Sequence, residues 1–587
     1  MKIHAISGIN FERRLKQSEK AEYSDVLNRG RDKCIGRNPE GKKFILIVPA
    51  SSLPNKTGVG NLNSPESQEF FDFAKLYWGI NENQILPIGQ YHSHREEYPI
   101  YSGSSMDLGN HVIDIQKYVS KEDFEEVIKN NKIKDRVNFS NVAEDNSAQE
   151  KALKKLFKSG KYQKEFEKFK AENSGRLEAK ALYRALREIN HSYNYNDWNN
   201  LDKNLFNRDV VTEEEFQKRV KEIRTLKGEQ MDFYYFKQFL AEDSLKNARE
   251  NLNKKGIKLN GDMLCGFSYD EVWANPKAFI PDTTIGWSLP ALNFETKEGQ
   301  QLLRDKVHFY AERFDGIRVD ASWTYSNQPQ IKNGNTIRKD YADKILNIID
   351  DEFKKVKGAD FDTRNIMHEF AASKTDFDIY DGQILKPYIK DRVKIYTSDH
   401  MSENWGTNKN FLERGWANDS FVIGTRNHDS GKIQVSREQI NALSDALKIP
   451  VENLKDPKEF TKAKLAEPMS AKYSMIYFAD ALNIDKQFQG NSDKTLNYAV
   501  LIPEDYQNRY FAALEKGEGF NPMDALEKSF KAKGLDKTEP ELFKKIVKYK
   551  KILGQKEKQT NPLLKIACGL ACIGLIIYGF FKFRKRR

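Results

Sequence analysis

The sequence is poor in the residues and motifs that mark disulfide-rich, secreted or nucleotide-binding proteins. Its 587 residues include four cysteines, Cys34, Cys265, Cys568 and Cys572. They are too few and too scattered for a disulfide framework, and no pair has the spacing of a zinc site. The N-terminus has no apolar run like a signal peptide, and no Gly-rich phosphate loop is found. We therefore expect a cytoplasmic body that uses no nucleotide.

An excess of positive charge is absent outside the C-terminal tail. The chain has a net charge of +11, but residues 544–587 alone carry 13 lysines and arginines against one acid. The rest of the chain is therefore close to neutral, without the basic groove of a nucleic-acid-binding protein. A composition of 39% hydrophobic and 12% aromatic residues excludes global disorder. We expect no nucleic-acid partner.

The tail itself contains the longest apolar run. Residues 566–581 are uninterrupted by charge, and spanning a bilayer takes about 20 residues with a lower limit near 17. Lysines and arginines flank the run on both sides, as expected beside anionic headgroups. The alternative is a buried hydrophobic helix. The pattern predicts a transmembrane anchor over residues 563–583 and hence a membrane-anchored cytoplasmic domain, with the orientation of the last residues left open.

Short apolar runs alternate with helical stretches, as in βα units. The eight runs cover residues 44–49, 84–89, 257–263, 314–320, 365–370, 393–398, 421–425 and 473–479. Several are almost wholly apolar before ending in a polar residue, which is typical of parallel strands covered on both faces. The predicted fold class is α/β: a (β/α)8 TIM barrel with a large helical insertion after the second strand and a C-terminal transmembrane helix.

The predicted organisation has four parts besides the insertion. An N-terminal segment covers residues 1–40, and the catalytic barrel covers 41–490. The helical insertion, rich in charged residues, interrupts the barrel at 115–250. Closing helices and a linker cover 491–554, and the anchor follows at 563–583.

Three carboxylates, Asp320, Glu369 and Asp429, end three of the predicted strands. Each one alone could be a helix cap or a salt-bridge partner. In a barrel, however, strand ends share the face where reactive groups sit. Glycosidic bond chemistry with retention needs one carboxylate as nucleophile and another as acid, about 5–5.5 Å apart. A third anion can stabilise the cationic transition state.

Several blocks resemble the 4-α-glucanotransferases, the amylomaltase or disproportionating-enzyme family (glycoside hydrolase family 77) of the α-amylase clan. The blocks are VPASSLPNKTGVGNL, YPIYSGSSMDLGNHVIDI, GDMLCGFSYDEVWANPKAF, IGWSLPALNF, FDGIRVDASW and VIGTRNHDS. The VWANP and R-x-D blocks are the most specific of them. The resemblance covers residues 44–430 with interruptions.

The resemblance implies roles for individual residues. Asp320 would be the nucleophile, Glu369 the general acid and base, and Asp429 the stabiliser of the transition state. Arg318 shares the strand face of Asp320 and would keep it ionised, unless it makes only a structural ion pair. The implied substrate-binding residues also include His428, Asp262, Trp287, Tyr98 and Tyr101. His428 could instead be a satisfied core histidine, and Trp287 and Trp273 could be packing residues.

The resemblance implies a 4-α-glucanotransferase acting on α-1,4-glucans and maltooligosaccharides, with no metal and no organic cofactor. Two other readings stay open: an α-glucoside hydrolase with the same carboxylates, and an inactive membrane-tethered barrel that binds glycans. The oligomeric state does not follow from the sequence.

Overall fold

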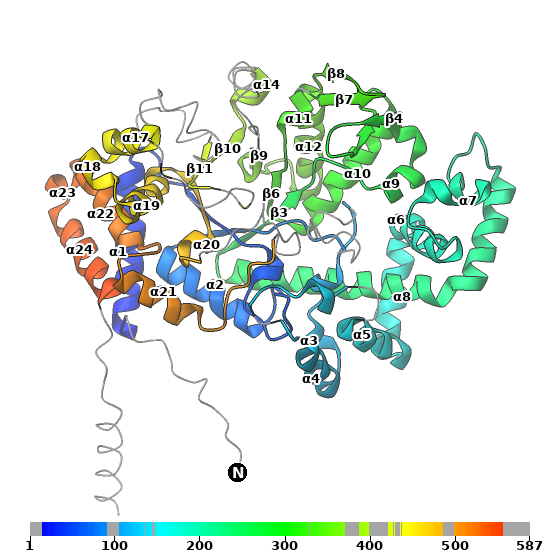
Figure 1. Cartoon of the computed structure of the whole chain (residues 1–587), viewed down its shortest axis with the longest axis horizontal. Helices are drawn as coiled ribbons and strands as arrows, with labels where there is room; N and C mark the ends of the chain where they lie inside the picture. Colours follow the sequence, from blue (N-terminus) through cyan, green and yellow to red (C-terminus); the bar gives the residue numbers. More distant parts are fainter. Residues whose placement is uncertain are drawn as a thin grey trace, which may run out of the picture.

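Eight parallel strands close into a barrel in this computed structural model (Figure 1). The structure describes residues 15–90, 105–133, 135–143, 147–326, 328–369, 387–397, 421–426, 428, 435, 437–484 and 498–555. The barrel strands are β1 (Lys43–Ile47), β2 (Glu82–Gln84), β3 (Lys258–Met263), β6 (Gly316–Val319), β9 (Ile366–Glu369), β10 (Val393–Thr397), β11 (Phe421–Gly424) and β12 (Tyr473–Tyr477). Each pairs in parallel with the next along the chain, and β12 pairs with β1 to close the ring.

The barrel agrees with the prediction, except that its second strand begins and ends earlier than expected. We expected that strand at residues 84–89, but β2 ends at Gln84. The N–H of Ile85 still donates to the Asn260 carbonyl at 3.1 Å. Pro87 then offers no N–H to the parallel ladder. The buried run that follows β2 is therefore packed against the core without being a strand.

Six α-helices lie between β2 and β3 among the residues that the structure describes. They are α3 (Ile115–Tyr118), α4 (Lys121–Asn130), α5 (Ala148–Ser159), α6 (Gln163–Ile189), α7 (Asn200–Lys203) and α8 (Glu213–Lys254). Figure 1 shows α6, α7 and the far part of α8 projecting to one side of the barrel. The long helix α8 begins at a capping box, in which Thr212 and Glu215 each bond the other's backbone N–H.

The other α-helices belong to the barrel or to the C-terminal part of the chain. They are α1 (Gln17–Ile35), α2 (Pro65–Trp78), α9 (Tyr269–Ala274), α10 (Lys297–Arg313), α11 (Trp323–Ser326), α12 (Ala342–Lys357), α14 (Pro387–Lys390), α17 (Arg437–Leu447), α18 (Val451–Leu454), α19 (Pro457–Ala466), α20 (Phe478–Ala481), α21 (Tyr506–Glu515), α22 (Pro522–Ala532), α23 (Leu535–Thr538) and α24 (Pro540–Gly554). The C-terminal helices α22 and α24 pack on α1, so the two ends of the described chain lie side by side (Figure 1).

A second, antiparallel sheet was not predicted. Its order is β5-β4-β7-β8, with β4 (Phe279–Thr284), β5 (Pro290–Leu292), β7 (Gln328–Lys332) and β8 (Asn335–Lys339). The β7–β8 hairpin turns at Asn333 and Gly334, which have φ of 50° and 77°. Two successive positive φ values are what a tight hairpin turn with the right twist requires.

The prediction of a C-terminal transmembrane helix is wrong. Among the described residues no helix is both long enough and apolar enough to cross a bilayer. The longest, α8, has 42 residues but carries charges along its whole length, and charge at membrane depth is costly. Residues 563–583 themselves lie outside the described residues. The expected membrane partner and membrane-anchored location rested on that segment alone, so neither is supported.

Arg31 of α1 holds the two strands that close the barrel. The side chain is 3% exposed, and its Nη2 donates to the Lys43 carbonyl on β1 and, at 2.9 Å, to Ser474 Oγ on β12. The same nitrogen reaches the Lys472 carbonyl at 3.3 Å. One guanidinium therefore satisfies acceptors on both sides of the seam between the first and last strands.

Replacing Arg31 with methionine is expected to lower the free energy of unfolding by about 3 kcal/mol, because buried acceptors lose their donor. Urea unfolding followed by circular dichroism measures the change. Arg29→Met on the same helix is the control, since the Arg29 side chain is 57% exposed and should contribute less than about 0.5 kcal/mol. Equal unfolding midpoints for the two variants would contradict this role.

Candidate active site

The carboxyl ends of β3, β6 and β9 bring four charged side chains together. Asp262 and Arg318 are direct partners in the β3–β6 register. Arg318 Nη1 donates to both carboxylate oxygens of Asp262, at 2.7 and 2.8 Å. Arg318 Nη2 lies 2.8 Å from Asp320 Oδ1 and donates to Glu369 Oε2 at 2.6 Å. A single guanidinium thus binds carboxylates from three strands, a geometry for which its planar fork is suited.

Burial divides these carboxylates into two kinds. The side chains of Asp262 and Arg318 are 0% and 2% exposed, whereas those of Asp320 and Glu369 are 17% and 15% exposed. Burial raises the pKa of Asp262, and the nearby charges of Asp320 and Glu369 raise it further against the opposing effect of Arg318. Asp262 therefore lies behind the arginine, and the other two carboxylates face accessible space.

The spacing of Asp320 and Glu369 is bounded by their common partner. Their oxygens lie 2.8 Å and 2.6 Å from the same nitrogen, so their separation cannot exceed the sum of the two distances. The two carboxyl groups are therefore close together, as in a retaining displacement (about 5–5.5 Å) and unlike an inverting one (about 6.5–9.5 Å). The arrangement suits one carboxylate as nucleophile and the other as proton donor.

The backbone after Asp320 also points at Glu369. Ala321 has a φ of 45°, which is uncommon for a residue with a Cβ, and its N–H donates to Glu369 Oε2 at 3.2 Å. Strain of this kind is found where a site demands a fixed geometry. The Oγ of the following residue, Ser322, lies 3.3 Å from His368 Nδ1. Burial lowers the pKa of His368 well below its ordinary value. The imidazole of His368 is therefore neutral.

Sequence reasoning missed Lys306, a cation beneath the same site. This residue of α10 is 1% exposed, and its Nζ donates to the carbonyls of Leu264 and Gly266 at 2.5 and 2.6 Å. It thereby holds the loop that follows β3 and Asp262. Burial lowers the Lys306 pKa to about 8, against the attraction of Glu271 and Asp320. Lys306 lies in a helical stretch rich in charged residues, so the sequence does not indicate that its side chain is buried.

The remaining predicted residues are placed differently. His428 is fully buried after β11, with its ring centroid 6.3 Å from that of Tyr498. Trp287 is 65% exposed in a loop and has a φ of 45°. Trp273 is a packing residue, because it is 3% exposed and its Nε1 donates to the Asp202 carbonyl.

Three predicted residues, Asp429, Tyr98 and Tyr101, lie outside the described residues. Arg426, in the same block as Asp429, pairs with Asp480 at 2.7 Å. Within the described part of the chain, no cluster of histidine, cysteine, aspartate and glutamate could hold a metal ion.

Together, fold and site define a class: a closed parallel barrel whose carboxyl face carries two partly exposed carboxylates held by one arginine. Residues 48–320 match the family model of glycoside hydrolase family 77, described as 4-alpha-glucanotransferase. The resemblance expected from the sequence is thereby confirmed. The match ends at Asp320, so the position of Glu369 rests on the structure.

Curated relatives carry the same name. A 4-alpha-glucanotransferase of Aquifex aeolicus is 28% identical over 301 residues, covering 47% of this chain and 58% of the relative. That of Clostridium butyricum is 28% identical over 242 residues, covering 39% and 45%. The chain thus spans about half the length of the curated relatives it matches.

Solved structures share the fold over a larger part of the chain. Amylomaltase from Streptococcus agalactiae, solved in complex with acarbose, aligns with a TM-score of 0.64 at 16% identity, covering 84% of this chain and 99% of that one. Amylomaltase from Corynebacterium glutamicum aligns with a TM-score of 0.57 at 13% identity, covering 89% and 76%. At these identities the likeness establishes the barrel architecture.

Lys306 should give the protein a distinct pH dependence of stability. A lysine whose folded-state pKa is about 8 rather than 10.5 loses its proton first in the folded state. Its contribution to stability therefore rises as pH increases from 8 to 10.5, by about 3 kcal/mol in total. Urea unfolding of the native chain and of Lys306→Met across this range measures the difference between them. A difference that stays constant with pH would contradict the lowered pKa of Lys306.

Proposed function

We propose that this protein is a 4-α-glucanotransferase, which moves α-1,4-glucan segments between maltooligosaccharides or glucans with retention of configuration. One observation carries the proposal: Asp320 and Glu369 share the Arg318 guanidinium, which holds the two carboxylates close together as double displacement requires. The family match and the names of the curated relatives support α-1,4-glucans as donor and acceptor.

In the first step, Asp320 attacks the anomeric carbon of the donor. A bond forms between that carbon and the Asp320 carboxylate as the glycosidic C–O bond breaks. Glu369 gives its proton to the departing oxygen, which leaves as a shortened glucan with a free hydroxyl. Arg318 keeps Asp320 ionised and oriented for attack.

In the second step, Glu369 as a carboxylate takes the proton from the 4-hydroxyl of an acceptor glucan. The acceptor oxygen then bonds the anomeric carbon, and the Asp320 carboxylate is released. Two inversions leave the α configuration unchanged. Transfer exceeds hydrolysis when a bound sugar hydroxyl is better positioned than water.

Other residues take supporting roles in this proposal. Asp262 orients Arg318, since both its oxygens bind that guanidinium. Asp429 is the proposed stabiliser of the transition state, and His428, Tyr98 and Tyr101 are proposed donors to sugar hydroxyls. Trp287 is proposed to stack on a pyranose ring, a role supported by its 65% exposure.

Incubation with maltotriose tests the reaction. The full chain should produce glucose together with maltooligosaccharides longer than the substrate, separated by chromatography. Asp320→Asn should lower turnover by at least about 10³-fold, because a neutral amide cannot form the covalent intermediate. Asp305→Asn, on the exposed face of α10, is the matched control and should keep full activity.

The product pattern also separates the competing functions. Glucose and maltose without longer products would identify a hydrolase. An unchanged substrate would favour a glycan-binding barrel without turnover. Either result would contradict the proposed transfer.

The acid role of Glu369 has its own test. Glu369→Gln should lower turnover of maltotriose by at least about 10²-fold. The first step should be largely restored with α-maltosyl fluoride, because fluoride leaves without protonation. A burst of fluoride release measured with an ion-selective electrode checks this. Asp320→Asn is the reference and should give no burst. Equal loss with both donors would contradict a role as proton donor.

A further inference from the structure

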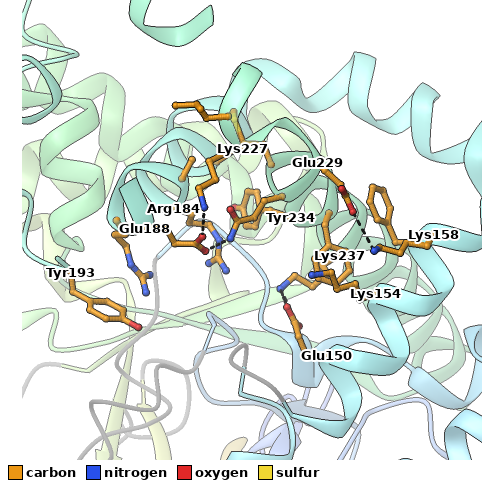
Figure 2. Close-up of a pocket in the computed structure, with 18 of the residues that line it drawn as sticks. Glu150, Lys154, Lys158, Arg184, Glu188, Tyr193, Lys227, Glu229, Tyr234 and Lys237 are labelled. Atoms are coloured by element: carbon orange, nitrogen blue, oxygen red, sulfur yellow. Dashed lines mark hydrogen bonds and ion pairs between the residues drawn. The ribbon is translucent and has the colours of Figure 1, made fainter. Parts of the chain in front are cut away.

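We propose that a cavity in the helical region between β2 and β3 binds a phosphorylated small molecule. The cavity has a volume of about 880 Å³ and is lined by residues of α5, α6, α8 and the turn that follows α6 (Figure 2). That volume suits a metabolite-sized ligand, for which sites of about 300–1,000 Å³ are usual. The described lining includes no residue of β3, β6 or β9. The inference is therefore independent of the proposed transfer reaction.

Basic side chains dominate the cavity wall. Its three glutamates are each paired with a lysine of the same wall: Glu150 with Lys237 at 2.8 Å, Glu188 with Lys227 at 2.9 Å and Glu229 with Lys158 at 3.7 Å. Four more cations line the cavity, Lys151, Lys154, Arg184 and Arg187. The wall thus has a clear excess of positive charge. Because the chain outside the C-terminal tail is close to neutral, this excess is a local feature.

The two arginines are held by aromatic rings. The guanidinium carbon of Arg184 lies 4.8 Å from the centroid of the Tyr234 ring, and that of Arg187 lies 3.9 Å from the centroid of Tyr193. A stacked guanidinium still has N–H groups in its plane for an acceptor. Arg187 Nε is buried and has no hydrogen-bond partner in the described structure. Figure 2 shows Arg184 and Tyr193 on one side of the cavity and Lys154 and Lys158 on the other.

These features together favour a phosphate ester. Phosphoryl oxygens accept charge-assisted hydrogen bonds from guanidinium and ammonium groups, which are about twice as strong as neutral ones. The wall also has an apolar part, since Tyr193 is 50% and Leu226 is 65% exposed. That part gives a surface for a ring. A sugar phosphate and a nucleoside monophosphate both combine a phosphate with a ring, and the experiment separates them.

Titration calorimetry on the full chain tests the site. The probes are pyrophosphate, glucose 6-phosphate and AMP, with glucose as the unphosphorylated comparison, all at one ionic strength. We expect saturable binding of at least one phosphorylated probe and none of glucose. In Lys151→Glu/Lys154→Glu its Kd should rise about tenfold or more. The matched control, Lys164→Glu/Lys218→Glu, changes exposed lysines on α6 and α8 outside the lining and should leave the Kd unchanged.

Four results would overturn the proposal. The first is that no phosphorylated probe binds. The second is that both double variants weaken binding equally, which would show a general charge effect. The third is that glucose binds as well as its phosphate. The fourth is that Asp320→Asn removes binding, which would place the ligand in the barrel site. Preference for glucose 6-phosphate or for AMP identifies the ring that the cavity accepts.

Discussion

The site depends on one buried guanidinium. Arg318 is 2% exposed and contacts the carboxylates of Asp262, Asp320 and Glu369. Without it, like charges from three strands would repel each other in a poorly solvated space. Burying a charged cluster is costly and stabilises a protein little. The arrangement is therefore better explained by what it holds in place, which is the spacing between Asp320 and Glu369.

Arg318 can position these carboxylates because contacts from several segments of the chain hold its surroundings in place. The β3–β6 register places Asp262 opposite Arg318, and Lys306 holds the loop that follows β3 through the carbonyls of Leu264 and Gly266. The N–H of Ala321, in a left-handed conformation, donates to Glu369. Each partner comes from a different segment of chain. A reactive geometry positioned by strands and their immediate ends is more precise than one built on loops alone.

How much the sequence could predict depended on how local each signal was. The barrel strands are apolar runs that end in polar residues, and this pattern can be recognised in each run without knowing which strands it pairs with. Asp320 and Glu369 were found because they end such runs. The antiparallel sheet was missed because β8 is exposed at every position and its Asn333–Gly334 turn was overlooked. Lys306 was missed because only the packed structure distinguishes a buried lysine from a solvated one. The membrane helix was inferred from the length of an apolar run and its cationic flanks, which say nothing of tertiary packing.

The two ends of the barrel differ in their balance of charged groups. At the amino end, Lys43 lies 3.4 Å from Glu82 and donates to Asn365 at 2.7 Å, while Asn260 donates to Glu82 at 2.8 Å. There one carboxylate meets two ammonium groups, since Lys258 also donates to Asn365 Oδ1 at 3.3 Å, and the amides complete the hydrogen bonding. At the carboxyl end one guanidinium faces three carboxylates. That end retains an excess of negative charge with two carboxylates partly open to solvent, a state suited to an incoming carbon that develops positive charge.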